Sequence, residues 1–200
     1  MKNYIVSEYR KTLSVFDKIL KDDIFLQNVE KIATKATQVL QNGGKIMFCG
    51  NGGSAADSQH LAAELVSKLY YDRPGLNAVA LTTDTSALTA IGNDYGYEKV
   101  FSRQVEAIGQ KGDMLIGFST SGRSKNVLLA FEKAKLMNII TVGFLGQDGR
   151  DIGKISDYQI NIPSSSTPNI QEGHISTGHI ICAIIEDNIF GEQYKPKDFK

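Results

Sequence analysis

The first forty residues carry apolar side chains at helical spacing. Five positions three or four residues apart mark a helix at the start of the chain: Ile5, Tyr9, Leu13, Phe16 and Leu20. A second set of the same kind runs from Val29 to Leu40. Asn42, Gly43 and Gly44 follow, and these residue types can take the left-handed conformation that closes a helix. The pattern therefore predicts two amphipathic helices in residues 1–42.

After residue 44 the pattern changes to short, mostly apolar runs that alternate with helical stretches. The runs typical of buried strands are Lys45–Cys49, Asn77–Leu81, Met114–Phe118, Ile139–Leu145 and Tyr158–Ile162. The helical stretches are Ala55–Tyr70, Lys125–Met137 and Ile170–Phe190. This alternation predicts an α/β fold with a mainly parallel sheet covered by helices on both faces. The 200 residues fit a single domain, and only the polar tail from Gln193 to Lys200 is expected to be loose.

Charge and composition exclude several classes of protein. Lys plus Arg and Asp plus Glu both number 22, so the chain has no net positive field to hold a nucleic acid or an anionic membrane. No run approaches the ~18 apolar residues of a membrane span, and the first residues lack the pattern of a secretory signal. We therefore expect a cytoplasmic protein without nucleic-acid or membrane partners. Cys49 and Cys182 lack metal or redox spacing and are expected to be buried apolar residues.

Two polar loops follow predicted strands and precede predicted helices. Residues 50–57, GNGGSAAD, come after the first strand, and residues 119–124, STSGRS, come after the third. Glycines let a backbone approach an anion, and a helix start with nearby hydroxyls favours phosphate. Taken singly, each loop is equally well explained as a structural turn or a helix cap. Because ligands of parallel sheets bind beyond the carboxyl ends of strands, the two loops together predict a pocket for a small phosphate-bearing ligand.

The three histidines all fall on predicted helices. His60 and Glu64 are four residues apart on the helix that starts at the glycine loop, so they share one face. Such a pair suits acid–base chemistry or metal binding, and the alternative is a surface hydrogen-bonded pair. His174 is expected to be a hydrogen-bonded core histidine. Within GNDYGYEKVF, Tyr95, Tyr97 and Phe101 are assigned to packing, whereas Asn93 and Asp94 face the pocket or form an Asx turn.

Four segments in this order resemble the phosphoheptose isomerase family of sugar isomerase (SIS) domains, from about Ile32 to Ile189. They are GNGGSAADSQHLAAEL, TTDTSALTAIGNDYGYEKVFSRQVEAIG, DMLIGFSTSGRS and NIQEGHISTGHI. The resemblance implies an α/β three-layer sandwich with a five-stranded parallel sheet, preceded by the two N-terminal helices. It also implies a homotetramer with active sites between subunits, and residues 1–42 are expected to serve that packing. The implied reaction interconverts sedoheptulose 7-phosphate and D-glycero-D-manno-heptose 7-phosphate, for the nucleotide-activated heptose of lipopolysaccharide or capsule.

The same resemblance implies roles for individual residues. Glu64 matches the catalytic base and His179 its partner acid, which suits a proton transfer between C1 and C2 through a cis-enediol. Residues matching substrate-binding positions are Asn51, Gly52, Gly53, Glu64, Asn93, Asp94, Ser119, Thr120, Ser121, Ser124 and Gln171. Family members are also described with zinc, whose ligands match His60, Glu64, Gln171 and His179. Gln171 and His179 are separated by a rise of about 12 Å on an unbroken helix, so one ion reaching both is difficult within one subunit.

The chain departs from the family pattern at two places. Lys68 stands where members carry an arginine after the catalytic glutamate, and Pro168-Asn169 replaces the usual Ala-Arg or Asp-Arg. Loss of a planar bidentate donor weakens contacts to phosphate or hydroxyl groups and puts the identity of the sugar in question. The alternative from another class is a non-catalytic SIS protein that binds a protein such as a replication initiator. Such proteins lack the matched catalytic pair, so Glu64 and His179 favour an enzyme.

Overall fold

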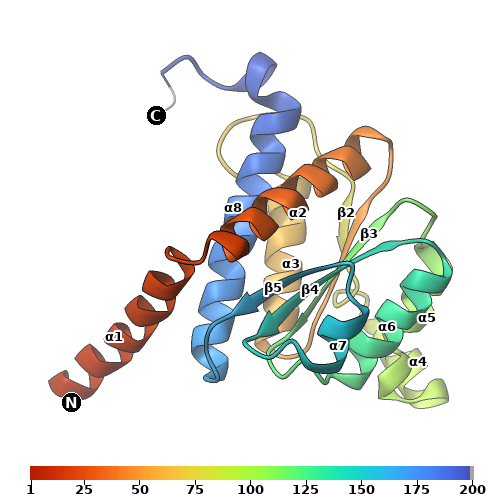
Figure 1. The fold of residues 1–200 in the computed structure, drawn as a ribbon. Helices are drawn as coiled ribbons and strands as arrows, with labels where there is room; N and C mark the ends of the chain where they lie inside the picture. Colours follow the sequence, from red (N-terminus) through yellow and green to blue (C-terminus); the bar gives the residue numbers. More distant parts are fainter. Residues whose placement is uncertain (199–200) are drawn as a thin grey trace.

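The computed structural model describes residues 1–198, and residues 199–200 lie outside the described part. Its strands are β1 (Ile46–Cys49), β2 (Ala78–Ala80), β3 (Met114–Ser119), β4 (Ile140–Gly146) and β5 (Tyr158–Ile162). Its helices are α1 (Lys2–Ile19), α2 (Asp23–Gln41), α3 (Gly53–Val66), α4 (Thr85–Tyr95), α5 (Ser102–Ile108), α6 (Lys125–Leu136), α7 (Arg150–Ile155) and α8 (Thr167–Tyr194), with a 3-10 turn, η1 (Tyr97–Lys99). Strands and helices alternate after α2, as the sequence predicts (Figure 1).

All five strands are parallel and lie in the order β2-β1-β3-β4-β5. The chain therefore leaves β1 in one direction to form β2 and then crosses to the other side of β1 to form β3. This reversal makes the carboxyl ends of β1 and β3 the switch point of the sheet, where open α/β folds bind their ligands. Both polar loops recognised in the sequence begin at these two strand ends. The predicted five-stranded parallel α/β fold is confirmed.

The sheet separates two layers of helices because strand side chains alternate between its faces. Ile46 and Phe48 face the core shared with α2, α3 and α8, while Met47 faces the core formed with α5, α6 and α7. Central strands are buried on both sides, so they are nearly continuous apolar runs, as β3 is from Met114 to Phe118. Figure 1 shows α8 and α2 lying across the first of these faces.

Three of the helix boundaries that differ from the sequence prediction belong to α3 and α8. Helix α3 ends at Val66 instead of Tyr70, because the guanidinium of Arg73 takes the carbonyl oxygens of Glu64, Leu65 and Ser67. Helix α8 begins at Thr167, with Pro168 in its first turn. It runs through Tyr194, so Gln193 and Tyr194, the first two residues of the predicted tail, belong to the helix.

Helices α4, α5 and α7 are absent from the sequence prediction. They are the short helices, of 11, 7 and 6 residues, and their apolar repeats are too brief to stand out. The two predicted N-terminal helices are confirmed, and α1 extends away from the rest of the fold (Figure 1). No helix among residues 1–198 has the length and apolar character needed to cross a membrane.

Candidate active site

The glycine loop joins β1 to α3 and depends on two of its glycines. Gly52 is the N-cap of α3 with φ of 59°, a conformation that glycine takes without strain. At Gly53 an added Cβ would lie only 2.6 Å from Nε2 of Gln171, so the end of the Gln171 side chain would have to move if residue 53 carried a side chain. The loop therefore brings Asn51, the N-terminus of α3 and Gln171 together at the sheet edge.

The second loop, at the end of β3, gathers serine hydroxyls. Ser119 Oγ lies 2.8 Å from Ser124 Oγ and 3.5 Å from Ser121 Oγ, and Ser124 is the N-cap of α6. A cleft of about 280 Å³ adjoins this loop and includes Thr120, Ser121 and Arg123 among its lining residues. Hydroxyls at the start of a helix can donate to a phosphate, and the helix dipole favours its charge. The predicted grouping of these serines is confirmed, and their role toward phosphate stays a prediction.

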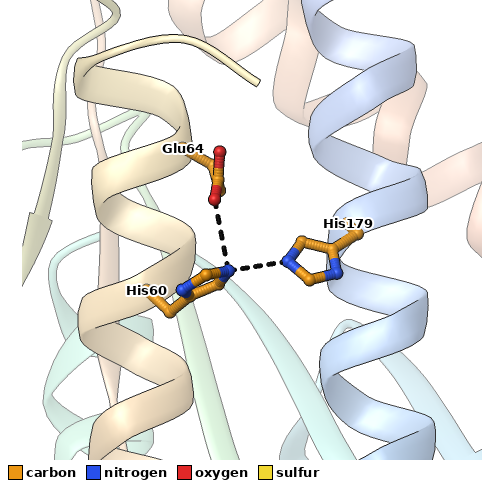
Figure 2. A group of neighbouring side chains, drawn as sticks. All are labelled: His60, Glu64 and His179. Carbon is orange, nitrogen blue, oxygen red and sulfur yellow. Dashed lines mark hydrogen bonds and ion pairs between the residues drawn. The ribbon is translucent and has the colours of Figure 1, made fainter. Parts of the chain in front are cut away.

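A cluster of two histidines and a glutamate lies between α3 and α8 (Figure 2). His60 Nε2 is 2.7 Å from His179 Nε2 and 3.2 Å from Glu64 Oε1. The side chain of His60 is 50% exposed and that of Glu64 is 19% exposed, so ligands can reach both. The predicted shared face of His60 and Glu64 is confirmed. The structure adds His179 to them, since α8 runs alongside α3 with Gly178 packed against Leu61.

The cluster fits a divalent metal. Its three ligand atoms, one from each residue, all lie within 4.8 Å of one another. Zinc takes nitrogen and oxygen ligands at about 2.0–2.2 Å, which places neighbouring ligand atoms roughly 3.3 Å apart. The 3.2 Å between His60 Nε2 and Glu64 Oε1 already matches this spacing, whereas the 2.7 Å between the two histidine nitrogens is about 0.6 Å too short, so the rings must move apart to take an ion. Gln171, the fourth predicted ligand, instead lies against Gly53 near the start of α8.

Asn93 and Asp94 lie in the last turn of α4, where both are exposed and Asn93 Nδ2 donates to Asp94 Oδ1 at 2.8 Å. No hydrogen bond or ion pair joins them to the other predicted site residues in the described part of the chain. Their side chains bond each other, and α4 continues through both residues.

Of the two departures from the family pattern, Pro168-Asn169 has an explanation in the described residues and Lys68 has none. Lys68 lies beyond the end of α3 and is exposed. Asn169 donates to Thr12 Oγ1 at 3.1 Å and to Glu172 Oε2 at 3.0 Å, so it ties α8 to α1. Pro168 occupies the first turn of α8, where a missing N–H costs nothing.

His174 is a core histidine, as predicted. It is fully buried, its ring packs edge-on against Phe118 and Phe144, and its Nε2 lies 3.1 Å from the carbonyl oxygen of Leu145. Burial lowers the pKa of His174 to about 4, and the bond to Leu145 only partly opposes this. The ring is therefore neutral at physiological pH and takes no part in the cluster.

Sequence reasoning passed over Asp57, which lies one turn before His60 on α3. Its Oδ2 is buried without a hydrogen-bond partner among residues 1–198. Burial raises the pKa of Asp57 to about 6, against the opposing charge of His60. The residue belongs to the GNGGSAAD motif, and its position three residues before His60 was the available signal.

Comparisons with known proteins agree with the geometry. Residues 9–146 match the SIS domain family. The chain is 54% identical over 194 residues to a phosphoheptose isomerase of Aneurinibacillus thermoaerophilus, covering 97% of this chain and 98% of that relative. The chain belongs to the phosphoheptose isomerase family of SIS domains. A phosphoheptose isomerase of Clostridium acetobutylicum is 51% identical, over 96% of this chain and 98% of the relative.

Solved structures of the family match the fold of this phosphoheptose isomerase family member closely. The structure of a phosphoheptose isomerase from Neisseria gonorrhoeae superposes with a TM-score of 0.87 at 42% identity, covering 93% of this chain and 98% of that one. A phosphoheptose isomerase from Francisella tularensis gives the same TM-score at 33% identity, over 92% and 97% of the two chains.

Proposed function

We propose that this protein is an aldose–ketose isomerase that interconverts sedoheptulose 7-phosphate and D-glycero-D-manno-heptose 7-phosphate. The observation that supports the proposal most strongly is that Glu64 on α3 lies close to His179 on α8 (Figure 2). The glycine loop (residues 50–57) leads into α3, and the serine loop (residues 119–124) follows the neighbouring strand β3. A carboxylate and an imidazole on opposite sides of one space suit a reaction that moves a proton between adjacent carbons. Relatives of more than half identical sequence that carry the name phosphoheptose isomerase support the substrate.

In the proposed mechanism Glu64 is the base and His179 the acid. Starting from the ketose, Glu64 removes a proton from C1 while His179 protonates the carbonyl oxygen at C2, which gives the neutral cis-enediol. Glu64 then returns its proton to C2, while His179 recovers a proton from the hydroxyl at C1 as that carbon becomes the aldehyde. Both groups end in their starting protonation states, so no other reactant is consumed.

The proposed substrate-binding set consists of the residues that lie around the two strand ends and the start of α8. The hydroxyls of Ser119, Ser121 and Ser124 supply donors to the phosphate, with Thr120 beside them. Binding of a phosphate remote from C1 and C2 orients the reacting carbons between Glu64 and His179. Asn51, Gly52, Gly53 and Gln171 border the same edge and are proposed to contact the sugar. Asn93 and Asp94 are kept in the proposed set on the family resemblance alone.

We propose that His60, Glu64 and His179 hold a zinc ion, with Gln171 as a further ligand if its side chain swings away from Gly53. A bound zinc ion supplies Lewis-acid polarisation of a substrate oxygen. Direct ligation makes a carboxylate less basic, so full coordination of Glu64 opposes its proposed role as base. Comparison of metal-stripped with zinc-loaded protein decides which of these effects dominates.

We propose a homotetramer in which partner subunits cover α1 and the start of α2. Large apolar side chains along these helices are more than half exposed in the protomer: Tyr4, Ile5, Tyr9, Leu13, Leu20 and Ile24. An apolar stripe of this kind is typical of a subunit interface. A mass measurement by light scattering is expected to give four times 21.9 kDa, and a monomer at micromolar concentration would contradict it.

We place the reaction upstream of nucleotide-activated heptose, for lipopolysaccharide or capsule. A cytoplasmic location is proposed because Cys49 and Cys182 are both free and buried, as is usual in a reducing compartment.

The alternative of a non-catalytic SIS protein is disfavoured, because a protein-binding role requires neither Glu64 nor His179.

The test is to incubate purified protein with sedoheptulose 7-phosphate, after metal removal and again with added zinc, and to follow the aldoheptose phosphate by NMR. Product under either condition supports the isomerase. Tight binding of the sugar phosphate with no product under both conditions would contradict it and favour the non-catalytic alternative.

A further inference from the structure

Tyr97 has a position that packing does not explain. The sequence assigned Tyr95, Tyr97 and Phe101 to packing, and Phe101 is indeed 1% exposed. Tyr97, in contrast, is 63% exposed, and its hydroxyl lies 3.2 Å from Oδ1 of Asn51 in the glycine loop. Gly96, with φ of 90°, makes the turn that directs η1 toward this loop. An exposed tyrosine is thus bonded to a residue of the proposed sugar site.

The hydrogen bonds around Asn51 fix the orientation of its amide. The backbone N–H of Val127 donates to Asn126 Oδ1 at 3.0 Å, and an N–H donor can only meet the oxygen end of an amide. Asn126 Nδ2 therefore faces Asn51 and donates to its Oδ1 at 2.8 Å. In return, Asn51 Nδ2 donates to Asn126 Oδ1 at 2.9 Å.

This chain of bonds gives the Tyr97 hydroxyl a defined role. Asn51 Oδ1 already accepts from Asn126, so the hydroxyl of Tyr97 supplies its second donor. The carbonyl end of the Asn51 side chain is then satisfied. The amide nitrogen has two hydrogens and gives one to Asn126, which leaves one N–H without a partner among residues 1–198. Asn51 directly follows the end of β1 and Gly50, at the switch point of the sheet, so this N–H is available to a ligand oxygen.

The network also links the two loops of the site. Asn126 lies in the first turn of α6, two residues after Ser124 of the serine loop, and is 4% exposed. Asn51 belongs to the glycine loop, and Tyr97 belongs to η1. The three side chains therefore set the distance between the serine loop and the glycine loop. Tyr97 is the only exposed member of the three.

We propose that Tyr97 is a positioning residue for substrate binding: its hydroxyl holds the Asn51 side chain so that the remaining amide N–H points to an oxygen of the sugar. This proposal rests on the proposed isomerase function for the identity of the sugar phosphate. The ligand group is a hydroxyl or carbonyl oxygen, because the side chain offers a neutral donor. Tyr97 acts through Asn51, so its effect falls on binding of the ground state and hardly on the proton transfer.

The test removes the hydroxyl alone. Tyr97→Phe is expected to raise KM for sedoheptulose 7-phosphate about three- to tenfold, the effect of one hydrogen bond, with kcat changed less than twofold. Tyr95→Phe is the matched control, since Tyr95 is 48% exposed on the same segment and its ring stacks under Arg103. It is expected to leave both constants unchanged. In an Asn51→Ala background, Tyr97→Phe is expected to change KM less than 1.5-fold, because the partner through which it acts is gone.

Binding without turnover separates this proposal from the proposed function. The Kd of sedoheptulose 7-phosphate is measured by calorimetry for Glu64→Gln and for Glu64→Gln with Tyr97→Phe, and the second is expected to bind three- to tenfold more weakly. If wild-type protein forms no product but this difference appears, the isomerase proposal fails and the role of Tyr97 stands. Four results would each overturn the role of Tyr97. Two concern the calorimetry: equal Kd values for the two proteins, or no binding of sedoheptulose 7-phosphate to either. The other two concern the kinetics: Tyr97→Phe raises KM as much in the Asn51→Ala background as in the wild type, or it lowers kcat and leaves KM unchanged.

Discussion

Two polar clusters join α3, or the segment just after it, to α8, and they differ in how completely their hydrogen-bonding groups are satisfied. The cluster of His60, Glu64 and His179 is partly exposed, and within residues 1–198 its side chains form hydrogen bonds and ion pairs only with one another. About two turns further along α8, Glu186 forms an ion pair with Arg73, which lies beyond the end of α3, and the two side chains are 1% and 0% exposed. Charged groups this deeply buried are costly unless every donor and acceptor is matched.

The buried pair is matched throughout. Glu186 accepts the backbone N–H groups of Leu69 and Tyr70 as well as Arg73 Nε. Arg73 in turn donates to carbonyl oxygens at the end of α3, including that of Glu64 at 2.8 Å. The saturated cluster ties the end of α3 to α8 through Arg73, whereas the unsaturated one, between α3 and α8, has hydrogen-bonding capacity left for a metal or a substrate. The comparison teaches that unused bonding capacity, more than polarity, distinguishes a chemical site from a structural one.

The largest effect is expected at the partly exposed cluster of His60, Glu64 and His179, which we call the open cluster. Glu64→Gln removes the base and changes the side-chain volume very little, so kcat should fall by at least about 10³-fold. The melting temperature and the subunit assembly should stay as in the wild type. Glu132→Gln, an exposed change on α6, is the control and should keep full activity. Turnover of Glu64→Gln within tenfold of wild type would show that the open cluster is not the chemical one.

The buried Arg73–Glu186 pair, which we call the closed cluster, should affect stability and leave activity nearly unchanged. Glu186→Gln leaves the buried Arg73 charge uncompensated and should lower the free energy of unfolding by about 3 kcal/mol or more. Urea titration measures this, and kcat per folded protein at low temperature should remain within a few fold of wild type. Asp187→Asn breaks only the exposed pair with Lys195 and should cost less than about 1 kcal/mol. An equal cost for the two variants would contradict the contrast between the clusters.

His174 sharpens the comparison, because it is a buried α8 residue that must stay neutral. Its pKa is lowered from 6.5 to about 4 by burial, so the unfolded chain binds a proton between these pH values and the folded chain does not. Stability is therefore lost as pH falls from 6.5 to 4, by up to about 3 kcal/mol. His174→Asn should flatten this part of the stability curve, measured by urea titration at several pH values. An unchanged slope would exclude His174 as the cause.

The smallest effect concerns the serine loop, whose hydroxyls also have spare bonding capacity. Ser119→Ala and Ser121→Ala should each weaken binding of the sugar phosphate about tenfold, because each removes one donor to the phosphate. Calorimetry in the Glu64→Gln background measures this without turnover. Ser102→Ala on α5 serves as the control. Unchanged affinity in both loop variants would move the phosphate to another part of the site.

The sequence predicts the parallel sheet well, because central strands buried on both faces are continuous apolar runs such as Met114–Phe118. It predicts the pairing of His60 with Glu64 because four residues make one helical turn. The residue spacing could not place His179, which reaches them only through the packing of α8 on α3; the family resemblance supplied that pairing. The end of α3 at Val66 was equally hidden, since it depends on Arg73, seven residues further on, and on Glu186 in another helix. Tyr97 was misjudged because an aromatic residue gives no sign in the sequence of whether it is buried.

The most direct test of the central claim follows the transferred proton. Wild-type protein and Glu64→Gln are incubated with sedoheptulose 7-phosphate in D₂O, and deuterium at C1 and C2 of the recovered sugars is read by NMR. The account predicts aldoheptose phosphate with wild-type protein, with carbon-bound deuterium wherever the proton held by Glu64 exchanges with D₂O before it is returned to carbon. It predicts neither product nor deuterium with Glu64→Gln, although the variant still binds the sugar. Product or deuterium exchange at near wild-type rates with Glu64→Gln would contradict the assignment of the open cluster as the site of chemistry.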